Sequence, residues 1–199
     1  MSEKIYSVVL AGVGGQGILL ASTVVARAAL AAGWTAKTNE VHGMAQRGGS
    51  VVAQIRFGAE VFSPLVSAGE ADALGALELA EAVRYAHYLR PGGWAVVSTQ
   101  RIVPVTALSG KAVYPADLES QLPAIFPRAA VLDAPRVALA AGHIKAANMV
   151  VVGALARGLP LPEPAWRQAL DQSVPEKFRA VNHAAFDAGW AAGAAGGTT

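Results

Sequence analysis

Apolar runs and stretches of helical period alternate along the first two thirds of the chain. Residues 5–11 (IYSVVLA) are mostly apolar and rich in β-branched side chains, and they lead into Gly12. Residues 18–32 are compatible with a helix and end at Gly33. This order predicts a strand, a glycine turn and a helix. Further strands are predicted at 35–41, 50–57, 71–77, 94–99 and 129–133.

The remaining segments have a helical pattern. One helix is predicted at 78–89, closed by Pro91, Gly92 and Gly93, and a short helix within 114–127. Four more helices follow without intervening strands, at roughly 136–142, 145–157, 163–173 and 176–192. The alternation predicts the α/β class: a Rossmann-like, mainly parallel sheet flanked by helices, with a helical C-terminal third.

The length of 199 residues fits one domain, predicted at 1–192. Residues 193–199 (GAAGGTT) carry no large side chain to bury, so they are predicted to form a flexible tail.

The amino-acid composition indicates that part of the surface contacts a partner. Hydrophobic residues make up 53% of the chain and charged residues 15%, with a mean hydropathy of +0.38. We therefore expect some apolar surface to meet another subunit or a second copy of the chain. Charges such as Arg27, Arg84 and Arg90 interrupt every apolar run before the ~18 residues that a membrane helix needs. With no export signal at the start, a soluble cytoplasmic protein without a membrane partner is expected.

The residue inventory excludes several functions. The net charge is +2 with no basic run, so nucleic-acid binding is disfavoured. Without cysteine the chain can hold neither a disulfide nor a thiolate-ligated iron–sulfur cluster, and it has no thiol nucleophile. His143 and His183 lack metal-ligand spacing with any third residue, and a Gly-x-Ser-x-Gly motif is absent. We therefore predict no catalytic residue and no metal site in this chain.

The first candidate site is the glycine loop between the first strand and the first helix. Gly12, Gly14 and Gly17 fit the pattern G-x-G-x-x-G, with Gly15 and Gln16 between them. Glycines there allow a close approach to a ligand, and the free amides of the helix start can hold a phosphate. Alternatively, the glycines only allow the strand and helix to pack closely.

A dinucleotide site is a further alternative for the same loop. NAD binding requires an acidic residue about 20 positions later, and Glu40 lies 23 positions after Gly17. His42 and a second glycine-containing loop follow Glu40 at once, which is unusual for a ribose pocket.

That second loop contains His42, Gln46, Arg47, Gly48 and Gly49. An arginine beside two glycines can direct its guanidinium at a phosphate or carboxylate. The loop follows the second strand, and we expect the first two strands to be neighbours, so both loops should meet at one edge of the sheet. Alternatively, Arg47 pairs with a local carboxylate.

Lys145 and Asn148 lie three residues apart at the start of an apolar helix. They share a helix face and could reach the same cleft, although Asn148 can equally bond a neighbouring backbone group.

The two loops carry a family resemblance. GVGGQG at 12–17 followed by EVHGMAQRGGSV at 40–51 resembles the gamma-type domain of pyruvate and 2-oxoacid:ferredoxin oxidoreductases, particularly beta subunits of the indolepyruvate type. The likeness covers nearly the whole chain. It continues through SPLV at 63–66, 72–78, PGG at 91–93, KAANMVVVGAL at 145–155, VPEKF at 174–178, and Asn182, Ala185 and Phe186.

In that family the complete enzyme decarboxylates a 2-oxoacid on thiamine diphosphate, passes electrons through iron–sulfur clusters to ferredoxin and releases an acyl-CoA. The resemblance implies an arylpyruvate substrate such as indolepyruvate. This chain lacks a GDG signature with paired asparagines and has no cysteine, so both cofactors should belong to a larger partner subunit, with ferredoxin reached through the complete enzyme.

Three hypotheses follow for this chain. It can be a non-redox subunit that helps to bind coenzyme A at the glycine loop and at the second loop, here called the RGG loop after Arg47, Gly48 and Gly49. It can also be a purely architectural assembly subunit, or an NAD- or FAD-binding oxidoreductase.

Overall fold

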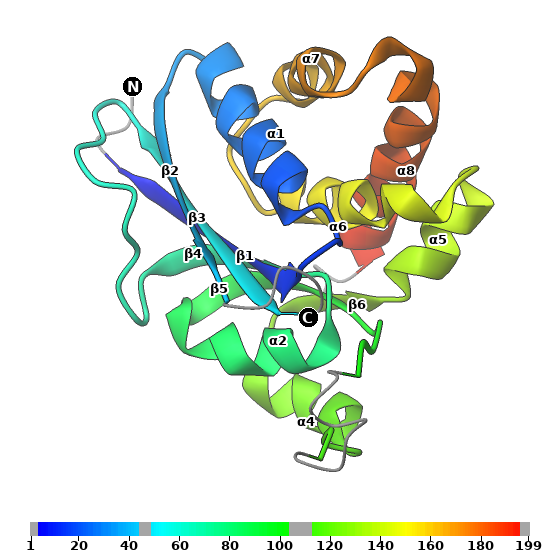
Figure 1. The fold of residues 1–199 in the computed structure, drawn as a ribbon. Coiled ribbons are helices and arrows are strands. Elements are labelled where there is room, and N and C mark those ends of the chain that lie inside the picture. Colours follow the sequence, from blue (N-terminus) through cyan, green and yellow to red (C-terminus); the bar gives the residue numbers. More distant parts are fainter. Residues whose placement is uncertain (1–3, 44–48, 104–112, 196–199) are drawn as a thin grey trace.

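A computed structural model describes residues 4–43, 49–103 and 113–195. Its centre is a six-stranded sheet with the order β2-β3-β1-β4-β5-β6 (Figure 1). The strands are β1 (Tyr6–Val13), β2 (Thr35–His42), β3 (Ser50–Gly58), β4 (Ala71–Ala76), β5 (Leu89–Ser98) and β6 (Ala129–Leu132). β1, β4, β5 and β6 pair in parallel, whereas β3 is antiparallel to both β1 and β2. The prediction of an α/β fold with a mainly parallel sheet is confirmed.

Helices cover both faces of this sheet. The α-helices are α1 (Ile18–Ala31), α2 (Leu79–Tyr85), α4 (Leu118–Ile125), α5 (Ala134–Ala140), α6 (Ala147–Ala156), α7 (Glu163–Ser173) and α8 (Glu176–Ala195). Two short 3-10 helices are η1 (Ala86–Tyr88) and η2 (Ile144–Ala146). α1 and α6 pack on one face with α7 and α8 behind them, and α2 and α4 lie on the other face (Figure 1).

The central strand β1 faces a hydrophobic core on each side. Val8 and Leu10 belong to the core under α1 and α6, and Val9 belongs to the core under α2 and α4. All three side chains are fully buried. Alternate side chains of a strand point to opposite faces, so an unbroken apolar run is what a strand covered on both faces requires.

The first two strands are not neighbours, which corrects the expectation. β3 lies between β1 and β2 because the connection 43–49 returns the chain antiparallel to β2. His42, at the end of β2, pairs with Val51 of β3, and Val13, at the end of β1, pairs with Ser50. The carboxyl ends of β1 and β2 therefore still lie at the same edge of the sheet.

The helix predicted at 78–89 is shorter than expected. α2 ends at Tyr85, η1 adds one 3-10 turn, and Leu89 already pairs with Ala71 at the start of β5. The PGG segment is therefore part of a strand and does not close the helix. A register shift between Ala71 and Ala73 accommodates it, with Gly92 at a φ of 71°.

The C-terminal helix is longer than expected. α8 continues to Ala195, so Gly193 is helical and buried where a tail was predicted to begin. It extends because α8 packs backbone to backbone on α6. A Cβ at Gly153 would lie 2.1 Å from the Phe186 carbonyl oxygen, and one at Gly189 would lie 2.0 Å from the Val150 carbonyl oxygen. Residues 196–199 lie outside the described part.

Within the described ranges, no helix combines the length and apolar character that crossing a membrane requires.

Candidate functional site

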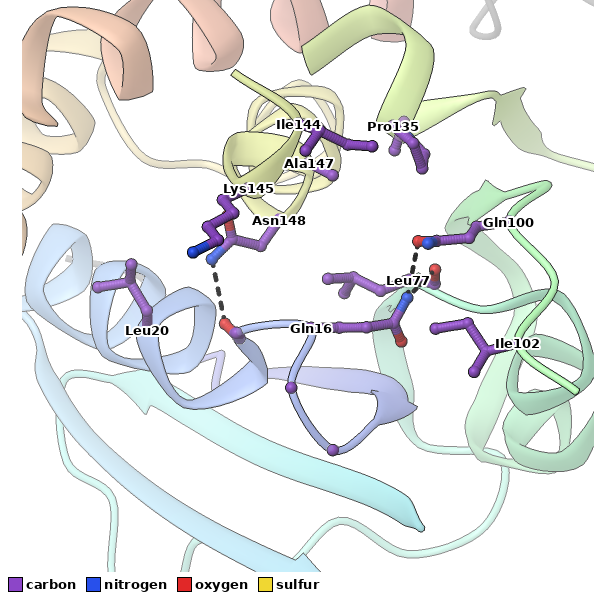
Figure 2. Close-up of a pocket in the computed structure, with 14 residues that line it drawn as sticks. Gln16, Leu20, Leu77, Gln100, Ile102, Pro135, Ile144, Lys145, Ala147 and Asn148 are labelled. Carbon is purple, nitrogen blue, oxygen red and sulfur yellow. Dashed lines mark hydrogen bonds between the residues drawn. The ribbon is translucent and has the colours of Figure 1, made fainter. Parts of the chain in front are cut away.

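A cleft of about 530 Å³ lies at the edge of the sheet where β1, β4 and β5 end (Figure 2). Its floor is the glycine loop, and its walls come from α1, the segment after β5, the start of α5, η2 and the start of α6. The lining residues are Gly14, Gly15, Gln16, Gly17, Leu20, Leu77, Gln100, Ile102, Ala134, Pro135, Ile144, Lys145, Ala147 and Asn148.

The glycine loop lines this cleft and contains backbone amides without a partner among the described residues. Gly15 and Gly17 have φ angles of 99° and 79°, in the left-handed region that glycine adopts without strain. Gly17 is the N-cap of α1 and offers no side chain to the helix. Among the described residues, the amides of Gly15, Gly17 and the first three residues of α1 (18–20) have no hydrogen-bond acceptor, and the first amide of the helix with one is that of Ala21, which donates to the Gly17 carbonyl at 3.0 Å. Such an uncapped helix start is suited to a phosphate or another anion.

Gln16 lines the cleft and also ties the loop to the neighbouring strands. Its Oε1 accepts a hydrogen bond from the Val13 amide at 2.8 Å, and its Nε2 donates to the Leu77 carbonyl at 2.7 Å and to Gln100 Oε1 at 2.9 Å (Figure 2). Gly12 lies within β1 and leaves room for this side chain, since a Cβ there would come within 2.7 Å of Gln16 Oε1. Both sequence-predicted residues therefore have a structural explanation.

Lys145 and Asn148 both line the cleft, as their spacing predicted. The Asn148 side chain is 3% exposed and donates from Nδ2 to the Gly17 carbonyl at 3.2 Å. A Cβ at Gly17 would lie 2.6 Å from this nitrogen, so the glycine also makes room for the asparagine. Lys145, on η2, is exposed and is the one charged residue among the described residues that line the cleft.

Gly49, the last residue of the RGG loop, contacts the glycine loop. The Gly49 carbonyl accepts a hydrogen bond of 2.9 Å from the Gly14 amide, so the two predicted loops meet. His42 lines a separate cleft of about 370 Å³ on the other side of the glycine loop. Gln46, Arg47 and Gly48 lie outside the described residues.

Glu40 is not placed as a ribose-binding carboxylate would be. Its Oε1 accepts a 2.7 Å hydrogen bond from Ser22 Oγ of α1. β3 also separates its strand from β1, whereas a dinucleotide site has the two strands adjacent. The geometry therefore argues against NAD at this loop.

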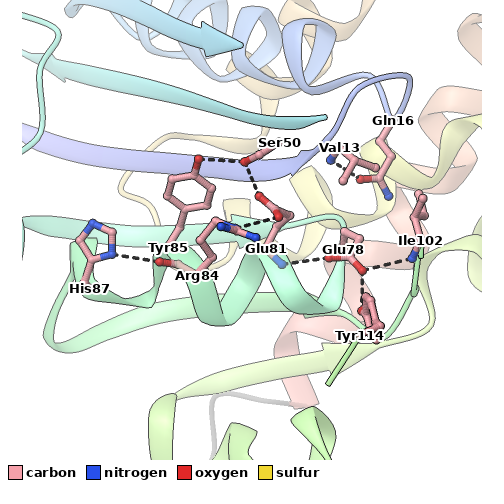
Figure 3. A network of polar contacts seen from close by, with 10 residues as sticks. All are labelled: Val13, Gln16, Ser50, Glu78, Glu81, Arg84, Tyr85, His87, Ile102 and Tyr114. Atoms are coloured by element: carbon pink, nitrogen blue, oxygen red, sulfur yellow. Dashed lines mark hydrogen bonds and ion pairs between the residues drawn. The ribbon is translucent and has the colours of Figure 1, made fainter. Parts of the chain in front are cut away.

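Two buried glutamates of α2 and its N-cap brace the same edge of the sheet, and sequence reasoning missed both (Figure 3). Glu81 Oε2 accepts a short hydrogen bond from Ser50 Oγ, which also lies 2.9 Å from the Tyr85 hydroxyl. Glu81 Oε1 accepts from Arg84 Nε at 3.0 Å. Ser50 follows Gly49, so this cluster fixes the end of the RGG loop.

Glu78 holds the segment after β5. Its carboxylate accepts hydrogen bonds from the Glu81 amide at 2.9 Å, the Ile102 amide at 3.1 Å and the Tyr114 hydroxyl at 2.6 Å (Figure 3). Burial raises the pKa of Tyr114, and the hydrogen bond to Glu78 raises it further, so Tyr114 remains a donor. A Glu-x-x-Glu pair inside an apolar stretch was the sequence signal for this network, because buried carboxylates need partners.

No group of three or more His, Cys, Asp or Glu residues in the described ranges could hold a metal ion.

One protein-family model matches nearly the whole chain. The model for the pyruvate ferredoxin/flavodoxin oxidoreductase family matches residues 7–192. Subunit IorB of indolepyruvate oxidoreductase from Thermococcus kodakarensis is 40% identical over 191 residues, which cover 94% of this chain and 95% of that protein. The Pyrococcus horikoshii protein of the same name is also 40% identical, over 194 residues, with the same coverage of both chains.

Solved structures share the fold. The gamma subunit of a keto/oxoacid ferredoxin oxidoreductase from Geobacter sulfurreducens superposes with a TM-score of 0.70 at 24% identity, covering 96% of this chain and 99% of that one. The 2-oxoglutarate:ferredoxin oxidoreductase of Magnetococcus marinus, solved with 2-oxoglutarate, coenzyme A and succinyl-CoA, gives a TM-score of 0.72 at 22% identity. The match covers 98% of this chain and 32% of that one.

Proposed function

The chain belongs to the pyruvate ferredoxin/flavodoxin oxidoreductase family, as a subunit of a 2-oxoacid:ferredoxin oxidoreductase, and we propose that its glycine-loop cleft holds the phosphates of coenzyme A. The observation that carries this proposal is the pair of unpaired amides at Gly15 and Gly17, two residues that line the cleft together with Lys145. The positive end of the α1 dipole adds ~0.3–1 kcal/mol for an anion. Coenzyme A in the Magnetococcus enzyme supports the choice of ligand.

The two ends of the cleft fit the two ends of such a ligand. Leu20 and Lys145 lie together at one end, and Ile102, Pro135 and Leu77 give the other end an apolar wall (Figure 2). Phosphates are recognised by charge and amides, and an extended acyl-carrier arm by apolar contacts.

The redox chemistry belongs to a larger partner subunit in this proposal. Thiamine diphosphate would supply the decarboxylation chemistry there, and iron–sulfur clusters on that subunit would pass the electrons to ferredoxin. A chain without cysteine cannot ligate such clusters by thiolates. The IorB relatives support an arylpyruvate such as indolepyruvate as the substrate.

Lys145→Ala in the enzyme reconstituted with its larger subunit tests the phosphate site. A charge-assisted hydrogen bond contributes about 1.5–3 kcal/mol. Because Lys145 is exposed, we expect the lower part of this range, a rise of about tenfold in the KM for coenzyme A. Lys145→Arg should restore most of the affinity, since the cation is kept.

Lys37→Ala is the matched control, because Lys37 is an exposed lysine on β2, away from the cleft. It should leave the KM for coenzyme A unchanged. Arg47→Ala extends the test to the RGG loop, from which the sequence predicts a second phosphate contact. If Lys145→Ala and Arg47→Ala both assemble normally and keep the original KM, the cleft is not the phosphate site and the subunit is architectural.

A further inference from the structure

The apolar end of the glycine-loop cleft lies beside a buried carboxylate, that of Glu78. Its side chain is 1% exposed, and it ends the stretch 72–78 that the family resemblance singled out. Leu77, the residue before it, lines the cleft, whereas Glu78 is not among the lining residues. The phosphate site makes no use of Glu78, so its burial calls for another explanation.

Ile102, a second residue of the apolar end, lies in a segment without regular secondary structure. β5 ends at Ser98, and residues 99–103 belong to neither a strand nor a helix. Where the pairing of strands ends, a backbone amide needs another acceptor. The Ile102 amide finds one in the Glu78 carboxylate, with Oε1 at 3.1 Å (Figure 3). One side chain outside the cleft therefore determines where this part of its wall lies.

The Glu78 carboxylate is itself held in one orientation. Its Oε1 also accepts from the Tyr114 hydroxyl at 2.6 Å, and its Oε2 accepts from the Glu81 amide at 2.9 Å. A carboxylate offers acceptors alone, and all three partners are donors. An amide of the same shape would direct an NH2 group at one of these donors and leave it unpaired. The arrangement therefore requires a carboxylate and not only a side chain of this size.

We propose that Glu78 is a positioning residue for the apolar end of the cleft. It holds Ile102 in the wall that Leu77 also lines, so that an arm leaving the diphosphate of the ligand finds both side chains in place. Glu78 touches no ligand and acts through Ile102. This inference rests on the proposed function, since a wall for the arm matters only if the phosphates bind at the glycine loop.

Glu78→Gln in the enzyme reconstituted with its larger subunit tests this role. Coenzyme A carries both the diphosphate and the arm, whereas ADP, used as a competitive inhibitor, carries the diphosphate without the arm. We expect the KM for coenzyme A to rise about four- to fifteenfold, the equivalent of one or two buried methylene groups, at unchanged kcat. The inhibition constant of ADP should stay as it was. The Leu79 amide still holds the Gln100 carbonyl, at 2.9 Å, so the change is confined to Ile102.

Tyr114→Phe provides a second variant, because it removes one donor to the carboxylate and keeps the charge. It should raise the KM for coenzyme A by about twofold, the effect of one neutral hydrogen bond. The double variant should be no worse than Glu78→Gln alone, because both changes act through the same carboxylate.

Glu119→Gln is the matched control. Glu119 is an exposed glutamate that accepts from Arg101 Nη2 at 3.0 Å, so it contacts the same segment from the solvent side. An exposed ion pair contributes little, and neither constant should change.

A KM for coenzyme A that stays the same in Glu78→Gln, or that rises in proportion to the inhibition constant of ADP, would overturn the positioning role and leave the phosphate site standing. If Glu78→Gln does not assemble, an unchanged KM in Tyr114→Phe overturns it instead. Failure of ADP to compete with coenzyme A in the wild-type enzyme would overturn the phosphate site and the role of Glu78 with it.

Discussion

The glycine loop shows what residue identity can and cannot predict. Two glycines of the motif, Gly15 and Gly17, have the positive φ angles that the pattern implies. Gln16 was predicted as part of the glycine-loop site, and the structure adds that its side chain bonds Val13, Leu77 and Gln100. The direction of that side chain depends on where β4 and β5 end, and the local sequence does not contain this information. The Glu78–Glu81 network was missed for the same reason, since its partners lie up to 36 residues away.

Asp72 supports a prediction at the residue scale. Burial raises its pKa, but hydrogen bonds from Lys4, from the Ser7 amide and from Arg90 lower it by more, so the net pKa lies below the usual value. A carboxyl group whose pKa is lower in the folded state stabilises the protein above its unfolded pKa of ~4. That contribution is lost as the pH falls through the folded pKa.

Asp72→Asn should therefore lower the free energy of unfolding at pH 7 by about 1–2 kcal/mol, a modest value because Lys4 and Arg90 are both partly exposed. The difference from the wild type should shrink as the pH falls below about 4. Urea unfolding at pH 7 and pH 3.5 measures it. A difference that is the same at both pH values would contradict the assigned role of the carboxylate.

At the scale of elements, strand and helix positions could be predicted well because each buried strand is an unbroken apolar run. The antiparallel β3 could not be placed by that pattern. The length of the connection did contain the signal, because residues 43–49 are too few for a crossover to a parallel strand, which takes a dozen or more. The end of the last helix was missed because small residues in 193–195 looked unfit for burial, whereas α8 needs small residues where its backbone approaches α6.

Gly153→Ala tests this close packing of α6 and α8. Helix propensity alone predicts that alanine stabilises an exposed helix by about 1 kcal/mol relative to glycine. The added Cβ would lie 2.1 Å from the Phe186 carbonyl, so the two helices must move apart. We expect overpacking to dominate, with a net loss of about 1–3 kcal/mol in the free energy of unfolding. Chemical denaturation that shows equal or greater stability would refute the packing argument.

At the scale of the whole molecule, the absence of cysteine supports a prediction about activity. The isolated chain should not oxidise indolepyruvate with a dye acceptor, and adding the larger subunit should restore turnover. Turnover by the chain alone would contradict the assignment of the redox groups to the partner. An absorption spectrum of the purified chain provides an independent check, since a flavin band would support the alternative of a free flavoprotein.

Synthesis from the N-terminus produces β1 before the two strands that pair with it in the sheet. β1 leaves the ribosome before either neighbour, because it pairs with β3 at residues 50–57 and with β4 at residues 73–76. It has seven buried positions, and its second edge is paired only after about 60 more residues have followed. A nascent chain that pauses before β4 therefore exposes one edge of a strand that is almost entirely buried in the folded protein. We expect that interval to be when the polypeptide most depends on chaperones.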